Sequence, residues 1–600
     1  MRRFLCGCVL VLVTLGTLCA QTPVPPDRIK GIQRINENDL RKDLSYIAGD
    51  SLEGRMSMQP GDEAAVKWIA QQFAQAGLTP ASTDNEGRPS FLQAMPLIEY
   101  RPDRTQTSVT LVRTGKTTTW KAPTVVGGFR RAEDLTAPVV FAGYGITAPE
   151  LGYDDYKGLD ANGKIVLVFD HEPQEDDPAS IFNGTGNTRY ATTRVKLLNA
   201  QKHGAIALLV VAEPNRKHLT NAERSARIGG SVTRAVPIPL QAIADDEIHI
   251  PSVMVLDEVA DELLATEAET HSRTGKDEAS ALQSAIDSHL TPQGRVLPNT
   301  VVTIHLVNSS ERTGTSWNVA GLLEGSDLKL KAETVMITAH HDHDGSSPCP
   351  AEEKPSTDQA ANANQASSSA GVDDHSKPIP AGPGCMQIWH GADDNGSGTV
   401  GVVELARAFA ANGTRPKRSI LFVVFASEER GLLGAYYMAQ HPLRPLATTR
   451  AQINFDMIGR DEQASRQTDG LIEIPQDTTN RLNLIGALYS PQYDAVVKEE
   501  NTHVGLVLDA RFDHENALNV FFRSDQFPFV LHDIPAFWWF TGFHPDYHHI
   551  TDTVEKIDFA KMKKILDLAY LSAWRFATDP TTPKFVPNPV PAGVHTSSIR

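Results

Sequence analysis

Five potential metal ligands follow short apolar segments in the second half of this 600-residue chain. They are two histidines and three carboxylates, namely His340, Asp394, Glu429, Asp456 and His548. Imidazole nitrogens and carboxylate oxygens form a mixed donor set that suits two zinc-type ions sharing one bridging carboxylate. Such a pair of ions can hold a hydroxide and polarise a carbonyl together. The chemistry that these residues indicate is therefore hydrolysis.

The first of the five, His340, ends the apolar segment 334–340 and is followed by His341, Asp342 and His343. Positions two apart on a strand share a face, so we expect His340 and Asp342 to point the same way. Asp342 could then accept a hydrogen bond from the His340 imidazole and fix its tautomer. His341 and His343 are expected to face the other side. Taken alone, such a run of histidines is more often a chance cluster than a metal site.

Two adjacent carboxylates, Glu428 and Glu429, follow a second apolar segment. They repel each other unless a cation or solvent compensates. We interpret Glu429 as a metal ligand and Glu428 as the general base, which takes a proton from a metal-bound water. The alternative interpretation is a solvated acidic pair at the start of a helix.

The remaining candidates carry weaker local signals. Asp456 lies in an apolar context, where a buried carboxylate needs a partner, although a cap or turn would also explain it. Asp394 stands in a segment typical of a turn, and His548 in an aromatic loop where it could simply pack. Asp552 and Glu555 resemble a capping box for the last helix, and we assign them no chemistry.

The second half of the chain alternates strand, turn and helix. Apolar segments of strand length, such as 334–340 and 419–427, are typical of strands buried on both faces of a sheet. Between them, 398–413 has the spacing of an amphipathic helix. We therefore predict an α/β fold, a mixed-sheet three-layer α/β/α domain. Ligands in such folds collect at the carboxyl ends of the strands, where His340, Glu429 and Asp456 lie.

Composition divides the chain into segments. Apolar residues at helical spacing in 36–78 predict helices, whereas short β-rich segments alternate with turns from about 100 to 300. We predict a discontinuous α/β domain (21–100 and 300–580) and an inserted β-rich domain (101–299). We also predict a polar loop insertion (346–389) and a Pro-rich tail (581–600). Cys349 and Cys385 stand at the ends of the polar loop and could form a disulfide or remain free thiols.

Residues 1–20 have the charged start, apolar stretch and small-residue end of a signal peptide. A transmembrane anchor is the alternative, although the apolar stretch is short for a membrane span. We expect a periplasmic or secreted protein with no membrane span in the mature chain. The net charge of -17 argues against a nucleic-acid surface.

Six segments together resemble the co-catalytic dizinc exopeptidases of the bacterial leucyl aminopeptidase and aminopeptidase Y type. They are AHHDHDG, GADDNGSGTVGVVELARAF, FASEERGLLGA, INFDMIGR, RSDQFPF and GFHPDYHHITDT. Residues 143–168 resemble the protease-associated domain inserted in many such enzymes. The polar loop 346–389 departs from the family pattern, because relatives connect the residues that correspond to His340 and Asp394 through far fewer residues.

The resemblance implies two Zn²⁺ per chain. His340 and Asp456 would bind one ion, Glu429 and His548 the other, and Asp394 would bridge them.

The resemblance also implies catalytic roles for three further residues. Glu428 would act as general base and then acid, Tyr547 would stabilise the oxyanion, and Asp342 would support His340. The segment 523–525 matches a family block near the substrate pocket, to which we assign no role.

The function that the resemblance implies is an exported aminopeptidase acting on peptides, of unknown oligomeric state. Three alternatives stay open: a glutaminyl cyclase, a carboxypeptidase, and a non-catalytic binding protein such as the transferrin receptor.

Overall fold

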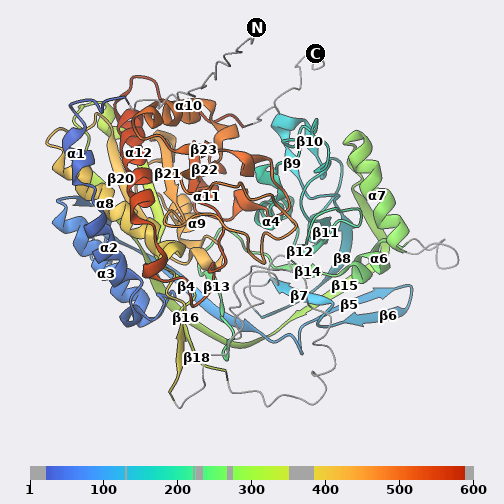
Figure 1. Ribbon diagram of the computed structural model, residues 1–600. Helices are drawn as coiled ribbons and strands as arrows, with labels where there is room; N and C mark the ends of the chain where they lie inside the picture. The colour runs from blue at the N-terminus through green and yellow to red at the C-terminus, as the bar shows by residue number, and fades with distance from the viewer. Residues whose placement is uncertain are drawn as a thin grey trace, which may run out of the picture.

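The structure, a computed structural model, describes residues 22–128, 132–220, 223, 234–265, 275–350 and 384–587. It has two large sheets, one in each lobe of the molecule (Figure 1). The predicted signal peptide, the middle of the polar loop (351–383) and residues 588–600 of the predicted tail lie outside the described residues. Among the described helices, none has both the length and the apolar character needed to cross a membrane.

The first sheet has ten strands, and its centre is parallel. The central strands lie in the order β20, β17, β21 and β24, and all three neighbouring pairs are parallel. Their bounds are Ser419–Phe425, Thr334–His340, Thr449–Phe455 and Ala536–Phe540. Almost every residue of these strands is buried, as the continuous apolar segments predict for strands covered on both faces.

Helices cover both faces of this sheet. One face packs on α2 (Glu37–Ile47), α3 (Pro60–Gln75), α8 (Gly398–Ala411) and α12 (Phe559–Thr578), which share one hydrophobic core with it. The other face packs on α9 (Leu433–Gln440) and α11 (Phe527–Val530) in a second core. Figure 1 shows the first group along the outer side of the sheet. The predicted three-layer α/β/α fold is confirmed.

The inserted lobe contains an eight-stranded sheet in the order β6-β5-β15-β8-β11-β12-β14-β7. The strands are Lys116–Trp120, Ser108–Arg113, Arg295–Leu306, Glu133–Phe141, Ile165–Phe169, Ala207–Val211, Ser252–Val255 and Val125–Gly128. The helices of this lobe within the described residues include α4 (Thr193–Lys202), α6 (Asp257–Leu264) and α7 (Gly275–His289). The insert is β-rich, as predicted.

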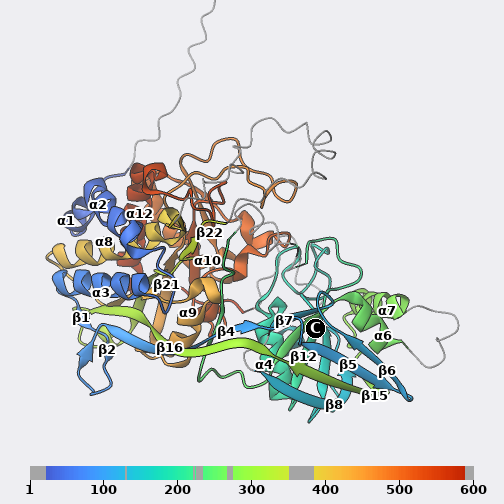
Figure 2. The ribbon, with the colours of Figure 1, turned by 90° about the horizontal axis from the view of Figure 1, so that it is seen from below.

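Two long strands lead from one lobe to the other. β4 (Leu92–Pro102) and β16 (Asn308–Leu323) pair along most of their length in the first sheet. They lie side by side in Figure 2, and β15 directly precedes β16 in the chain. A third strand from within the predicted insert, β13 (Leu240–Ile243), also joins the first sheet, where it pairs with β4.

The ends of the predicted polar loop are ordered against each other. β18 (Ser346–Pro348) pairs with β19 (Met386–Ile388), and a disulfide joins Cys349 to Cys385. The main-chain N–H of Trp389 donates to the oxygen of Gly345, at 2.9 Å. The base of this loop therefore lies directly after the strand that ends in His340.

Candidate metal centre

The candidate ligands converge at the carboxyl edge of the parallel strands. His340 is the last residue of β17, Glu429 lies in the turn after β20, and Asp456 directly follows β21. His548 lies in the loop after β24, and Asp394 in the turn that leads into α8. The carboxyl ends of parallel strands meet at one edge of a sheet, so residues far apart in the chain come together there.

Asp394 lies between the two imidazoles. Its Oδ1 is 3.6 Å from His340 Nε2, and its Oδ2 is 3.4 Å from His548 Nε2. Asp456 Oδ1 lies 3.5 Å from His340 Nε2, and Glu429 Oε2 lies 3.4 Å from His548 Nε2. The five side chains thus form two groups that share one carboxylate.

These distances fit metal ligands better than hydrogen bonds. A separation of 3.4–3.6 Å is long for a hydrogen bond, and His340 Nε2 is buried without a hydrogen-bond partner among the described residues. Ligands about 2 Å from a tetrahedral zinc ion stand roughly 3.3 Å apart. The donor set, two imidazoles and three carboxylates, also suits zinc.

The charges of the site call for a cation. Burial raises the pKa of Asp394 well above its usual range, and the nearby Glu429 and Asp456 raise it further. Burial and the same two neighbours raise the pKa of Glu428, while His340 opposes the shift. Asp525 is also fully buried, and neither of its carboxylate oxygens has a hydrogen-bond partner among the described residues. Closely packed buried carboxylates are costly unless cations compensate for their charge.

Asp342 supports the site differently from the sequence expectation. Because β17 ends at His340, the alternation of a strand does not continue to Asp342. His340 Nδ1 lies 3.2 Å from the main-chain oxygen of Asp342 and 3.8 Å from its carboxylate. A carbonyl oxygen only accepts, so this contact favours a proton on Nδ1 and leaves Nε2 for a metal. The Asp342 carboxylate instead accepts from the main-chain N–H groups of Glu428 (2.9 Å) and Glu429 (3.3 Å).

His343 was expected to face away from the site, and that expectation is wrong. Its Nδ1 lies 2.6 Å from Glu429 Oε1 and 4.0 Å from Asp394 Oδ2. The physical reason is again the end of the strand, after which side chains no longer alternate between two faces. His341 does face the other side, where its Nδ1 lies 3.1 Å from Asp62 Oδ1.

Two further aspartates that the sequence interpretation left without a role hold the site. Asp344 Oδ2 lies 3.0 Å from His548 Nδ1, and its Oδ1 accepts from Arg430. Asp552 accepts from the main-chain N–H groups of Asp393 and Asp394. The predicted capping box at Asp552 is therefore wrong. The terminal helix α12 begins at Phe559, and its N-cap is the next aspartate along the chain, Asp558.

A buried arginine holds two of the site's loops together. Arg55 is 1% exposed and donates to the main-chain oxygens of Ile47, His341, His390 and Gly391. Burial lowers its pKa to about 10, so the guanidinium stays charged at neutral pH. One side chain thus fixes the backbone next to His340 and the backbone before Asp394.

Tyr547 and Arg523 lie beside the candidate ligands. Arg523 Nη2 donates to the Tyr547 hydroxyl oxygen at 3.2 Å, and the Tyr547 ring stands edge-on to His548. Burial raises the pKa of Tyr547 well above its usual value, so the phenol is neutral. Asp546 holds the start of this loop by ion pairs with Arg460 and Lys556.

Comparisons with known families agree with this architecture. Residues 318–572 match peptidase family M28, and residues 135–263 match the PA domain.

Among curated proteins, the chain is 38% identical over 112 residues to a probable zinc metalloprotease of Pyrenophora teres f. teres, covering 17% of this chain and 24% of that protein. It is 28% identical over 169 residues to leucine aminopeptidase 2 of Trichophyton rubrum, covering 28% and 30%. The chain therefore spans less than a third of the length of these two relatives.

Among solved structures, the chain is similar to the aminopeptidase from Aneurinibacillus sp. strain AM-1, with a TM-score of 0.44 and 17% identity over 95% of this chain and 98% of that one. It is also similar to a zinc aminopeptidase from Bacillus subtilis, with a TM-score of 0.40 and 16% identity over 94% and 99% of the two chains.

We predict that the Asp342 carboxylate stabilises the Glu428–Glu429 turn. Asp342→Asn replaces one of the two accepting oxygens with an amide that donates toward a main-chain N–H. We expect the turn to lose about 1.4 kcal/mol of local stability, within the range for a buried donor left unsatisfied. Its amides should then exchange about tenfold faster by hydrogen-exchange mass spectrometry. Asp50→Asn, at an 85% exposed carboxylate, is the control. Unchanged exchange in Asp342→Asn would show that the turn is held by other contacts.

Proposed function

We propose that this chain, which belongs to peptidase family M28 and carries an inserted PA domain, is a zinc-dependent aminopeptidase that removes N-terminal residues from peptides. The observation that carries the proposal is the position of Asp394, with one carboxylate oxygen toward each of two imidazoles. A carboxylate in this position can bridge two ions, and Glu428 lies beside it.

The ligand assignment follows from the two groups around Asp394. His340 and Asp456 would hold one zinc ion, Glu429 and His548 the second, and Asp394 both, which gives two ions per chain. When bound, the pair supplies Lewis acidity, which lowers the pKa of water and polarises a peptide carbonyl.

Glu428 is the proposed general base. Its Oε2 lies 3.7 Å from His340 Nε2, and its side chain is only 9% exposed. Burial raises the pKa of Glu428, which brings the carboxylate closer to the range in which a group both accepts and returns a proton. Glu428 would take a proton from the attacking water and pass it to the nitrogen of the leaving amine. The same side chain would thus accept one proton and return it in each turnover.

Tyr547 is the proposed donor to the oxyanion. Arg523 occupies the hydroxyl oxygen of Tyr547 as a donor, so the phenol hydrogen remains for another acceptor. A positively charged donor on the oxygen also strengthens the phenol as a donor. The tetrahedral intermediate would receive this hydrogen bond where its negative charge develops.

We also propose the domain boundaries, the location of the protein and the charge of its substrates. The peptidase domain comprises 21–100 and 300–580, and the PA-type insert comprises 101–299. Residues 1–20 would direct export to the periplasm or the exterior. The Cys349–Cys385 disulfide supports this location, because structural disulfides persist in oxidising compartments. The carboxylate-rich site, with Asp525 beside the ligands, favours substrates with a free α-ammonium group.

Glu428→Gln tests the assignment of the base. The amide is nearly isosteric but cannot accept the proton, so kcat should fall by about three orders of magnitude while zinc content stays the same. Glu324→Gln, at a half-exposed glutamate paired with Lys331, should keep wild-type turnover. Glu429→Gln should instead lower the zinc content. A kcat for Glu428→Gln within tenfold of wild type would remove Glu428 from the mechanism.

A substrate panel tests the aminopeptidase assignment. Aminoacyl 4-nitroanilides with a free amino group should be hydrolysed at least about a hundredfold faster than their N-acetylated forms, because acetylation removes the charge that the carboxylates would bind. A chelator should abolish both rates. Preference for an N-blocked dipeptide with a free carboxyl terminus would point to a carboxypeptidase instead.

A further inference from the structure

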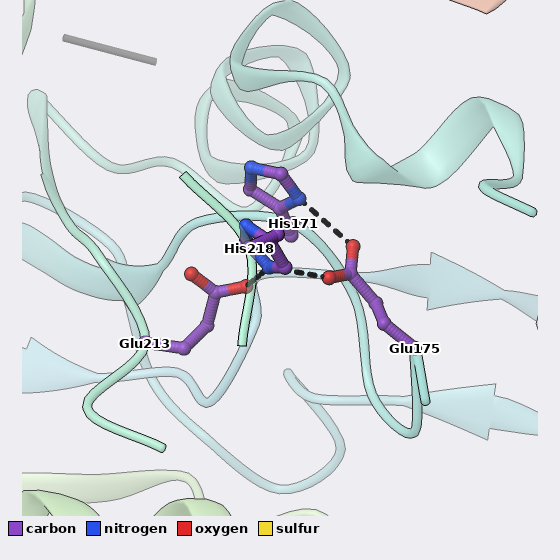
Figure 3. A group of neighbouring side chains, drawn as sticks. All are labelled: His171, Glu175, Glu213 and His218. Carbon is purple, nitrogen blue, oxygen red and sulfur yellow. Dashed lines mark hydrogen bonds and ion pairs between the residues drawn. The ribbon is translucent and has the colours of Figure 1, made fainter. Parts of the chain in front are cut away.

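A second group of possible metal ligands lies in the inserted domain. His171, Glu175, Glu213 and His218 each offer one ligand atom within 4.8 Å of the others (Figure 3). The sequence interpretation did not single out these residues. They belong to none of the segments that carry the family resemblance to the zinc peptidases.

The four residues come from two loops at one edge of the inserted sheet. His171 and Glu175 follow β11, and Glu213 and His218 follow β12. These two strands are parallel neighbours, so their carboxyl ends lie side by side. In both sheets, residues that follow neighbouring parallel strands meet at the carboxyl edge of the sheet.

The contacts within the cluster are close and buried. His218 Nε2 faces two carboxylates, Glu175 Oε2 at 2.6 Å and Glu213 Oε1 at 3.5 Å. His171 Nδ1 lies 2.8 Å from Glu175 Oε1, and the two imidazole rings stack 4.2 Å apart. No side chain of the cluster is more than 7% exposed. Figure 3 shows Glu175 in contact with both imidazoles, and Glu213 on the other side of His218.

Glu175 lies within hydrogen-bond distance of both imidazoles, 2.8 Å from His171 and 2.6 Å from His218, so a bound ion would replace these two contacts. Two stacked imidazoles would repel each other if both carried a proton, whereas one divalent ion can bind both as neutral rings. The hollow at the cluster is rich in acidic side chains, namely Glu172, Glu175, Asp176, Asp177, Glu213 and Asp287, with Arg216 and Lys217 as its basic lining. Of these, Glu172, Glu175 and Glu213 are buried, whereas Asp176 and Asp177 are exposed, and a bound cation would compensate for the buried carboxylates.

The backbone around His171 is held in a constrained form. His171 has φ 54°, in the left-handed region that non-glycine residues rarely adopt. The fully buried Lys196 donates to the main-chain oxygens of His171 and Tyr144. This contact fixes the loop in the conformation that presents His171 to the cluster.

We propose that His171, Glu175, Glu213 and His218 form a binding site for one zinc-type divalent ion, separate from the candidate metal centre of the peptidase domain. Two imidazoles and two carboxylates complete a tetrahedral set, as in sites that stabilise structure rather than catalyse. Imidazole donors favour zinc and its neighbours over calcium or magnesium, which prefer oxygen ligands alone.

The site would also stabilise the boundary between the two domains. Asn519 of the peptidase domain lies 3.4 Å from His171 Nε2, and Asn516 donates to the main-chain oxygen of Glu175. Asn187, in the chain that follows Glu175, donates to Asn519. The same peptidase segment continues into Arg523, which contacts Tyr547. A metal that orders the 171–188 loop would therefore restrain the segment behind the active site.

Metal counting tests the proposal directly. The full-length mature protein is stripped with a chelator, reloaded with Zn²⁺ and freed of unbound metal, and zinc per chain is measured by mass spectrometry. We expect the double variant His171→Ala/His218→Ala to hold one zinc fewer than wild type. His249→Ala, which removes an exposed imidazole from the same domain, should match wild type. Equal zinc in wild type and the double variant would overturn the proposal.

A second variant covers a loss of folding. Glu175→Gln/Glu213→Gln keeps the shape of both side chains and should show the same loss of one zinc with the circular dichroism of wild type. Retention of that zinc would also overturn the proposal. The result is a difference between variants, so it does not depend on how many ions the peptidase domain holds. Hydrolysis of a nitroanilide reports separately on the proposed function.

Discussion

The carboxyl edge of the parallel sheet concentrates buried negative charge. Asp394, Glu428, Glu429 and Asp456 lie within a few ångströms of two imidazoles, and burial raises the pKa of Asp394 and of Glu428. Side chains at these positions reduce stability unless something compensates for their charge, so their presence together has to serve a site. The distances around Asp394 are compatible with the two shared ions proposed above, and Glu428 Oε2 lies 3.7 Å from His340 Nε2.

Much of the surrounding structure holds the backbone in place rather than the side chains. Arg55 binds four main-chain oxygens, Asp342 binds two main-chain N–H groups, and Asp552 binds two more. Each contact fixes a turn that carries one or more of the candidate ligands. Ligands placed by such turns keep their geometry because the loops themselves cannot shift independently.

The sequence predicted the elements well because their signals are local. Continuous apolar segments give the strands β17, β20 and β21, and the helical spacing of 398–413 gives α8. The sequence analysis expected His340, Glu429 and Asp456 at the carboxyl ends of strands, and the parallel order of these strands brings them together.

The wrong predictions concern residues whose side-chain positions depend on contacts with distant parts of the chain. His343 turns into the site because β17 stops at His340, and Asp552 binds the Asp394 turn, about 160 residues away in the chain, rather than its own helix. The His171 cluster shows the same limit, since neither half of it forms a recognisable motif alone. Its two loops meet only because β11 and β12 are neighbours in the sheet.

Zinc-edge anomalous diffraction from crystals of the zinc-loaded protein tests the central claim most directly, because it locates ions without assuming a mechanism. The account predicts two peaks roughly 3.5–4 Å apart on either side of Asp394, one next to His340 and Asp456 and the other next to Glu429 and His548. A single peak there, or zinc bound only at other positions, would contradict it.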